Sequence, residues 1–310
     1  MRKKKSNDKR NQLPLSTNLW CWAFVSITLI FYIFFQGWPI ICSIYYSLLD
    51  WSGLTVSGTY IGLSNYKELF QDQLYWNAFF NSFKYTIEYV PLILICSLFL
   101  ALVLNNRRLG GKTFYRTIYF MPVVTTAAVI GIIMIFIFGT QGPVNEVLKI
   151  FHITEKSIGF LTNGKYALTT VVLISVWKDC GIYMIYWIAG LQSIPVEMYE
   201  AAELDGANSF QKFYKIILPL IAPTAGIITI LCCINSLKVF DIVKTMTEGG
   251  PFYKTDVMGT FVYRSAFSSE IGLPRVGYAS ASAILFGITV IIIVASTSAL
   301  KNKLSNSSSI

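Results

Sequence analysis

The chain has 310 residues, of which 54% are hydrophobic and 13% charged, and its formal net charge at pH 7 is +9. Soluble globular domains carry about 25% charged residues, so this composition indicates that lipid, not water, is the main solvent. The six cysteines lie within or beside apolar stretches and show neither C-x-x-C nor Cys/His spacing. That pattern disfavours a disulfide framework or a zinc site.

The first ten residues carry six Lys and Arg residues, as the n-region of a signal peptide would. The apolar run that follows is about twice as long as the ~7–15 residues of a signal-peptide h-region and shows no small-residue cleavage site. We therefore expect residues 1–19 to be a cytoplasmic tail and the first apolar run to stay in the membrane.

Six apolar stretches are long enough to cross a bilayer, whose hydrocarbon core of about 30 Å needs about 20 helical residues. They are residues 20–46, 78–104, 116–138, 167–191, 216–240 and 277–300. The predicted fold is an all-α polytopic membrane protein, with a six-helix transmembrane domain over 20–300 and a second cytoplasmic tail at 301–310.

Six crossings place both termini on one side, and the basic N-terminus favours the cytoplasm. Counting Arg116 with the inner loops, 14 of the 25 Lys and Arg residues then fall on the cytoplasmic side, in agreement with the positive-inside rule. The cytoplasmic segments are 1–19, 105–115, 192–215 and 301–310, and the outer loops are 47–77, 139–166 and 241–276.

Three local features are expected in the first two spans and the loop between them. Pro39 predicts a kink in span one, because proline removes a backbone donor and clashes with the preceding turn. Residues 60–70 predict a turn followed by a short amphipathic helix at the membrane interface. Lys84 and Glu88 are spaced i,i+4 and predict an ion pair, with cavity lining as the alternative.

The second inner loop contains Gly110-Gly111-Lys112-Thr113, which invites comparison with a phosphate-binding loop. A Walker A motif needs a glycine where this chain has Asn106, and it needs a preceding soluble strand. No ATP site is therefore expected here. The loop more plausibly places its cations against anionic headgroups; these are Arg107, Arg108, Lys112 and Arg116.

Charged and polar residues interrupt spans four and five. Lys178 and Asp179 lie near the middle of span four, where an ionisable group costs about 2.5–3.5 kcal/mol unless it pairs or faces water. A neutralising pair with another helix and the wall of a polar substrate cavity are both open, and they are compatible. Span five ends in a second polar cluster, Asn235 to Asp241.

The sequence offers no catalytic constellation. His152 is the only histidine, and one histidine in an outer loop, without paired carboxylates or thiols, makes neither a metal site nor a triad. An integral membrane enzyme is therefore disfavoured.

The loop at 192–215 carries the one acidic run of this basic chain. Pro195 suits a first helical turn and Gly206 the residue past a helix end, so about three turns of helix are expected between them. Glu197, Glu200 and Glu203 are spaced i,i+3 and form one acidic stripe. A second helix is expected after 208, capped by Asn208 and Gln211, and running through Pro219 into span five.

An acidic stripe is a poor match for the membrane surface, because the cytoplasmic leaflet is itself negatively charged. A protein partner with a basic-rimmed groove fits better, since its Arg or Lys residues would pair with the stripe. Ala201, Ala202 and Ala207 would let such a partner approach closely.

The motif Glu200-Ala201-Ala202, Gly206 and Ile216-x-Leu218-Pro219 resembles the EAA loop of importer permeases of the ATP-binding cassette (ABC) superfamily. The resemblance covers nearly the whole chain and points to the carbohydrate-uptake class of binding-protein-dependent permeases. It also rests on four further segments: Gly62-Leu63-Ser64-Asn65-Tyr66, Gly190-Leu191-Gln192-Ser193-Ile194-Pro195, Thr247-Glu248-Gly249-Gly250-Pro251, and Tyr263 with Ala266-Phe267.

The resemblance implies two sets of functional residues. The EAA loop would form a coupling helix seated in a cytoplasmic ATPase, with the docking residues Glu200, Ala201, Ala202, Glu203, Asp205 and Gly206. The substrate pathway would be lined by Ser175, Trp177, Lys178, Asp179, Ile182, Cys232, Asn235, Ser236 and Val239. The Lys178-Asp179 pair departs from a neutral sugar site, so a charged or uronic sugar stays open.

The implied function is a permease subunit that moves a sugar by alternating access. Its implied partners are a second homologous permease, a dimeric ATPase that binds ATP and Mg²⁺, an extracellular solute-binding protein and the lipid bilayer; nucleic acid and cofactors in this chain are not expected. The alternatives are an ABC permease for a non-sugar solute, a self-sufficient secondary transporter or channel, and a membrane scaffold without transport.

Overall fold

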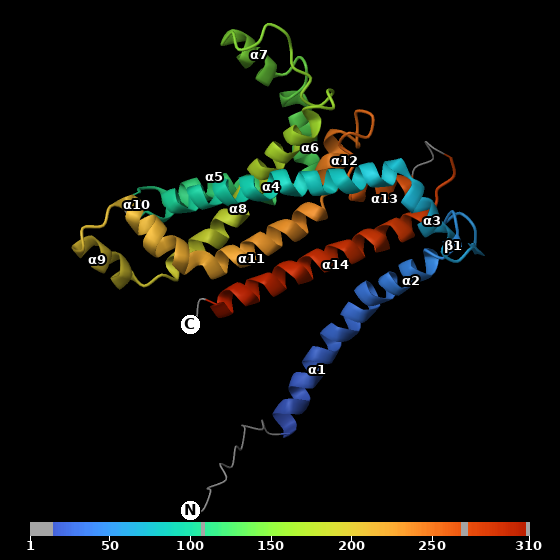
Figure 1. The fold of residues 1–310 in the computed structure, drawn as a ribbon, viewed down its shortest axis with the longest axis horizontal. Helices are drawn as coiled ribbons and strands as arrows, with labels where there is room; N and C mark the ends of the chain where they lie inside the picture. Colours follow the sequence, from blue (N-terminus) through green and yellow to red (C-terminus); the bar gives the residue numbers. More distant parts are fainter. Residues whose placement is uncertain (1–14, 107–108, 268–271, 308–310) are drawn as a thin grey trace, which may run out of the picture.

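The computed structural model describes residues 15–106, 109–267 and 272–307, and the side chains within residues 20–296 of these ranges. Helices dominate the described chain (Figure 1). Their bounds are α1 Leu15–Tyr32, a π-helical turn at Ile33–Gly37, α2 Trp38–Tyr46, α3 Ser64–Gln71, α4 Gln73–Asn105, α5 Lys112–Val124, α6 Ala127–Ile137, α7 Pro143–Ile150, α8 Ala167–Gln192, α9 Val196–Leu204, α10 Ser209–Lys212, a π-helical turn at Phe213–Ile217, α11 Leu218–Leu237, α12 Asp241–Met246, α13 Met258–Phe267 and α14 Val276–Ser307.

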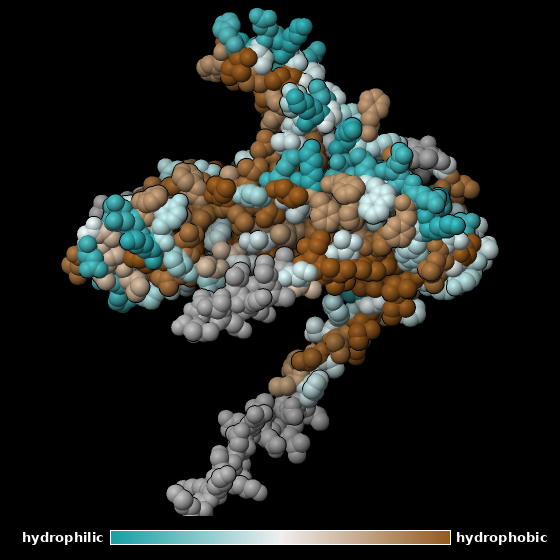
Figure 2. Space-filling model, viewed as in Figure 1, coloured by the Kyte–Doolittle hydropathy of each residue, from teal (hydrophilic) through white to brown (hydrophobic). Residues whose placement is uncertain are grey.

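Five helical segments are long and apolar enough to cross a membrane, and they confirm five of the six predicted spans. They are Trp20–Tyr46, Gln73–Asn105, Ala167–Gln192, Ser209–Leu237 and Val276–Ser296. Figure 2 shows why these segments need lipid: apolar side chains cover much of the visible surface, and hydrophilic groups gather on the projecting segment, along the upper side of the body near its base, and at the left end. The basic residues expected within 1–14, and the headgroup contacts expected of Arg107 and Arg108, lie outside the described residues.

The expectation of one continuous helix over 116–138 is wrong. Two helices, α5 and α6, stand in its place and meet at an angle of 98°. Thr125 and Thr126 both have extended backbone, with ψ of 137° and 142°. Two consecutive extended residues end α5 and change the direction of the chain before α6 begins. Pro122 lies in the last turn of α5, where it removes a backbone donor and weakens the helix just before the break.

The core of the bundle lies where α8 packs against α4, α5 and α11. Helix α8 is the most enclosed of the spans, with 61% of its apolar window buried. Gly181 makes its contact with α5 possible, because a Cβ there would lie 2.2 Å from the carbonyl oxygen of Tyr119. The helix expected to carry functional residues is therefore held on three sides by its neighbours.

The two ends of the bundle differ in structure. Figure 1 places α9 and α10 at one end, together with the C-terminal end of α14, and α3 and α13 toward the opposite end; α12 lies beside α6. The α6–α7 segment projects sideways from the long helices. This arrangement agrees with a chain that crosses the bundle repeatedly and returns the 192–215 loop to the same end as the C-terminus.

The predicted amphipathic helix after the first span is confirmed as α3. Its buried residue Asn65 donates from Nδ2 to the carbonyl oxygens of Ser47 and Leu49, both at 2.9 Å. These bonds fasten α3 to a hairpin of two short strands, β1 Leu49–Asp50 and β2 Thr59–Tyr60, which was not predicted. In the first span, the π-helical turn stands directly before Trp38-Pro39, where the kink was expected.

The loop between α12 and α13 wraps around a buried carboxylate. Asp256 has no exposed surface, and its oxygens accept from Arg264 at 2.5 Å and from Thr260 at 2.6 Å. Gly249 has φ of +87°, and a Cβ there would lie 2.9 Å from Asp256 Oδ1, so only glycine fits. Burial raises the pKa of Asp256, while the bonds from Arg264 and Thr260 act in the opposite direction.

Candidate functional site

The acidic loop forms a helical hairpin with the predicted caps. Helix α9 begins after Pro195 and ends at Leu204, and Gly206 follows with φ of +72°. A left-handed residue of this kind commonly ends a helix, and glycine adopts it without a steric penalty. Residues 195 and 206 thus set the length of α9, as the sequence predicts.

The second arm of the hairpin is continuous with a membrane-spanning helix. Gln211 N donates to Asn208 Oδ1 and Asn208 N donates to Gln211 Oε1, both at 2.9 Å, which confirms the predicted capping box. An ion pair of 2.8 Å between Lys212 and Glu203 joins the two arms. Ser209–Leu237 is one helical segment, so the arm that the ion pair joins to α9 is continuous with α11.

The expected docking residues of α9 lie on its outer side, with one exception. The side chains of Glu200, Glu203 and Asp205 are exposed, as are Ala201 and Gly206. Ala202 is only 6% exposed and faces the rest of the chain. The acidic stripe is therefore accessible to a partner, while Ala202 is buried on the opposite side of α9 and is not accessible.

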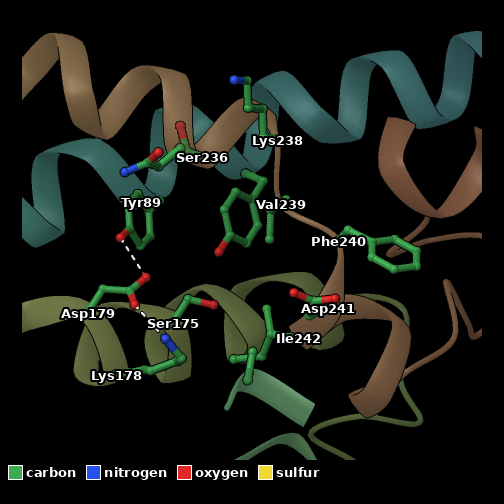
Figure 3. Close-up of a pocket in the computed structure, with 13 residues that line it drawn as sticks. Tyr89, Ser175, Lys178, Asp179, Ser236, Lys238, Val239, Phe240, Asp241 and Ile242 are labelled. Carbon is green, nitrogen blue, oxygen red and sulfur yellow. Dashed lines mark hydrogen bonds and ion pairs between the residues drawn. The ribbon is translucent and has the colours of Figure 1, made fainter. Parts of the chain in front are cut away.

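A polar pocket of about 160 Å³ lies between α4, α8 and the segment where α11 gives way to α12 (Figure 3). Its lining residues are Tyr85, Tyr89, Ala127, Ser175, Lys178, Asp179, Asn235, Ser236, Lys238, Val239, Phe240, Asp241 and Ile242. Six of the nine residues predicted for the substrate pathway line it: Ser175, Lys178, Asp179, Asn235, Ser236 and Val239.

The charged pair of α8 is neutralised within the pocket wall. Lys178 Nζ donates to Asp179 Oδ1 at 3.0 Å, and Tyr89 OH of α4 donates to Asp179 Oδ2 at 3.0 Å. The lysine side chain is 16% exposed and the aspartate 31%. The two charges neutralise each other on α8, and not through a charged partner on another helix as one reading expected; α4 supplies only the hydroxyl of Tyr89. Both residues line the pocket, and its use by a substrate stays a prediction.

The opposite wall comes from the end of α11. Asn235 Nδ2 donates to Tyr183 OH at 3.1 Å, and Ser236 Oγ donates to Thr86 Oγ1 at 3.0 Å. These bonds tie α11 to α8 and α4. The helix ends at Leu237, earlier than the predicted span, so Val239 reaches the pocket from the non-helical break that follows.

Three predicted pathway residues do not line the pocket. Trp177 is 50% exposed and Cys232 is fully buried, and Ile182 packs against the core. The predicted ion pair of Lys84 with Glu88 is present at 3.9 Å, away from the pocket, and Glu88 also accepts from Thr169 at 3.0 Å. Within the described residues, no three His, Cys, Asp or Glu side chains are arranged to hold a metal ion.

Sequence reasoning missed the contribution of α4. Tyr85 and Tyr89 are one helical turn apart, buried, and stacked with ring centroids 5.6 Å apart. Their i,i+4 spacing in an apolar span was the available signal, but aromatic residues at that spacing usually pack in a core. Asp241 belonged to a recognised polar cluster without being assigned to the pathway.

Residues 89–306 match the family described as binding-protein-dependent transport system inner membrane component. The chain is 32% identical to the probable ABC transporter permease protein YurN of Bacillus subtilis, over 83% of this chain and 85% of that protein. It is 31% identical to the probable starch degradation products transport system permease protein AmyD of Thermoanaerobacterium thermosulfurigenes, over 89% of this chain and 92% of that protein.

The lactose transport system permease protein LacF of Rhizobium radiobacter is 30% identical, over 84% of this chain and 86% of that protein. Among solved structures, a chain of a bacterial alginate ABC transporter, in complex with an alginate pentasaccharide-bound periplasmic protein, superposes with a TM-score of 0.80. That likeness covers 94% of this chain and 96% of the other at 22% identity, and it establishes a shared fold.

Proposed function

Because the chain belongs to the family of binding-protein-dependent transport system inner membrane components, we propose that it forms part of the sugar pathway of an ABC importer. In this role it is a membrane-spanning permease subunit and carries no ATPase site. Relatives described as permeases for starch degradation products and for lactose support a sugar as the substrate.

One observation carries the proposal: a polar pocket lies in an apolar bundle, between the two helices that the acidic hairpin connects. Polar groups inside a membrane protein are costly and commonly mark a substrate pathway. The tyrosines, serines and Asn235 of this pocket offer donors and acceptors for sugar hydroxyls. The volume of about 160 Å³ is smaller than the roughly 300 Å³ of typical ligand pockets, so we expect one sugar ring to occupy it at a time.

The energy would come from a partner ATPase docked on α9. ATP and Mg²⁺ would bind that partner and close its dimer, and the exposed acidic stripe of Glu197, Glu200 and Glu203 would follow the movement. Because an ion pair between Glu203 and Lys212 joins α9 to α10, and α10 is continuous with α11, a displacement of α9 would shift the pocket wall. A ligand shifts an equilibrium between two states only if it binds one state more tightly than the other. Here the ligand would be the nucleotide, and the two states would be the open and closed forms of the ATPase dimer.

The remaining partners are a second homologous permease subunit, which would supply the other side of the pathway, and an extracellular solute-binding protein that would deliver the sugar. In this arrangement the chain is a multi-pass protein of the cell membrane, with both termini in the cytoplasm. A solved transporter of the same fold that was crystallised with a periplasmic protein is consistent with that assembly.

The test is uptake into proteoliposomes that contain the permease pair, the ATPase and the binding protein, with and without ATP. We expect Glu200→Lys to abolish ATP-driven uptake and the stimulation of ATPase by loaded binding protein, because a cation would replace part of the acidic stripe. Glu155→Lys, the same exchange in the 139–166 loop, serves as the control. Uptake by this chain alone on an ion gradient, or full coupling in Glu200→Lys, would contradict the proposal.

A further inference from the structure

Two charged groups of the pocket lining, Lys238 and Asp241, have no side-chain partner among the described residues. Asp241 is the first residue of α12 and lines the pocket from the break after α11. Within the described residues, no hydrogen bond or ion pair engages its carboxylate; only its backbone oxygen is used, as an acceptor from Thr245 Oγ1 at 2.6 Å. Its side chain is exposed.

A purely local role for Asp241 would be to cap the first turn of α12. Acidic residues stabilise helix N-termini by accepting from free backbone N–H groups. Phe240 occupies the capping position of α12, and no side chain caps that end. The carboxylate instead points toward the Ser175 hydroxyl across the pocket (Figure 3), so it faces the space that a substrate would occupy.

The pocket lining holds three other charged groups, Lys178, Asp179 and Lys238. Lys178 and Asp179 neutralise each other at 3.0 Å. Lys238 lies at the C-terminal end of α11, and its amine points away from Asp179 and Asp241 in Figure 3. A ligand ring between α8 and the break therefore meets a neutral pair on one side and an unshared carboxylate on the other.

We propose that Asp241 is a specificity-determining residue of the pathway, which binds hydroxyl groups of neutral sugars and disfavours sugars that carry a carboxylate or phosphate. A carboxylate can accept hydrogen bonds from two hydroxyls, and such charge-assisted bonds are stronger than neutral ones. The same carboxylate repels an anionic sugar, because two like charges at close range disfavour each other. This inference rests on the proposed function and narrows its substrate class.

The inference is tested by equilibrium binding to the complex of both permease subunits and the ATPase in nanodiscs. The binding protein is omitted so that selectivity arises in the membrane part. Radiolabelled maltotriose is the neutral probe and trigalacturonate the anionic probe. In the wild type we expect maltotriose to bind at least tenfold more tightly than trigalacturonate.

The informative variants are Asp241→Asn and Asp241→Glu. We expect Asp241→Asn to weaken maltotriose binding about tenfold, the effect of losing one charge-assisted hydrogen bond, and to narrow the preference over trigalacturonate. Asp241→Glu keeps the charge and should retain most of that preference. The matched control is Glu248→Gln, which removes a carboxylate just past the other end of α12. Glu248 pairs with Lys244 at 3.6 Å, and its substitution should change the affinity for neither maltotriose nor trigalacturonate.

The outcomes separate the two proposals. Suppose that the wild-type complex binds maltotriose, and that Asp241→Asn has the same affinity for each probe as Glu248→Gln has. The role of Asp241 is then refuted, while the proposed sugar pathway stands. Tighter binding of trigalacturonate by the wild type would equally refute it. If the assembled wild-type complex binds neither probe and takes up neither in the complete system, the sugar function fails and the role of Asp241 fails with it. Size-exclusion chromatography confirms that each variant assembles.

Discussion

The buried pair of Asp256 with Arg264 allows a quantitative prediction for the segment between α12 and the end of α13. The perturbation is Arg264→Met, which removes the cation and keeps a long apolar side chain. Asp256 has no exposed surface and Arg264 is 12% exposed. Removing one partner of such a pair costs about 3–5 kcal/mol, because the other charge stays buried and uncompensated.

An independent estimate of this cost follows from proton binding. Without Arg264, Asp256 can avoid burying a charge by remaining protonated. Its ordinary pKa is 3.8, and each pH unit above that value costs about 1.4 kcal/mol, so protonation at pH 7 costs about 4 kcal/mol. The two estimates agree, and the expected loss of unfolding free energy at pH 7 is about 4 kcal/mol.

The sign of the pH dependence follows from the direction of the pKa shift. Burial raises the pKa of Asp256 and Arg264 opposes that rise, so the substitution raises it further. A raised acid pKa means that the folded state holds the proton more tightly, and stability is lost as pH rises from 3.8 toward the folded-state pKa. The variant should therefore lose about 1.4 kcal/mol of unfolding free energy for each pH unit between 3.8 and its folded-state pKa, a wider pH range than in the wild type.

The assay is thermal unfolding of the assembled complex at pH 5, 6, 7 and 8 and one heating rate. The double variant Arg264→Met with Asp256→Asn should lose the added pH dependence, because an amide does not titrate there. Lys244→Met breaks an exposed pair with Glu248 and should change stability by less than about 1 kcal/mol. An Arg264→Met protein with the midpoint and pH slope of Lys244→Met would refute the reasoning.

Three further predictions concern single substitutions. Gly206→Ala meets no neighbouring atom within 4 Å, so only its φ of +72° is strained; we expect a loss of about 1–2 kcal/mol and reduced ATP-coupled uptake. Glu68 is held by Arg275 through two bonds of 2.6 Å, which lower its pKa; stability from this pair is present above pH 4.5 and lost on acidification. Glu68→Gln should remove this acid-dependent loss of stability in thermal unfolding, which we expect to be at most about 1 kcal/mol because both side chains are about half exposed. Tyr89→Phe removes a charge-assisted bond to Asp179 and should lower unfolding free energy by about 1.5–3 kcal/mol and slow sugar uptake.

Features set by neighbouring residues could be predicted from the sequence. The ends of α9 follow from Pro195 and Gly206, and the cap of α10 follows from Asn208 and Gln211, because the atoms involved lie within a few positions of each other. Five spans follow from apolar length alone. The 98° break between α5 and α6 was not predicted, since Pro122 is tolerated in many membrane helices and the direction of the chain after Thr125 depends on what it packs against.

The sequence by itself determined that this chain crosses a membrane repeatedly and carries an acidic, capped hairpin between two spans, because length, periodicity and capping are local properties. Only the tertiary structure decided which polar residues meet. It brought Tyr89 to Asp179 from a helix some 90 positions away in the sequence, and it placed Asp241 in the same pocket by ending α11 at Leu237. Those contacts depend on how α4, α8 and α11 pack together, and packing between distant segments is not encoded in any single stretch.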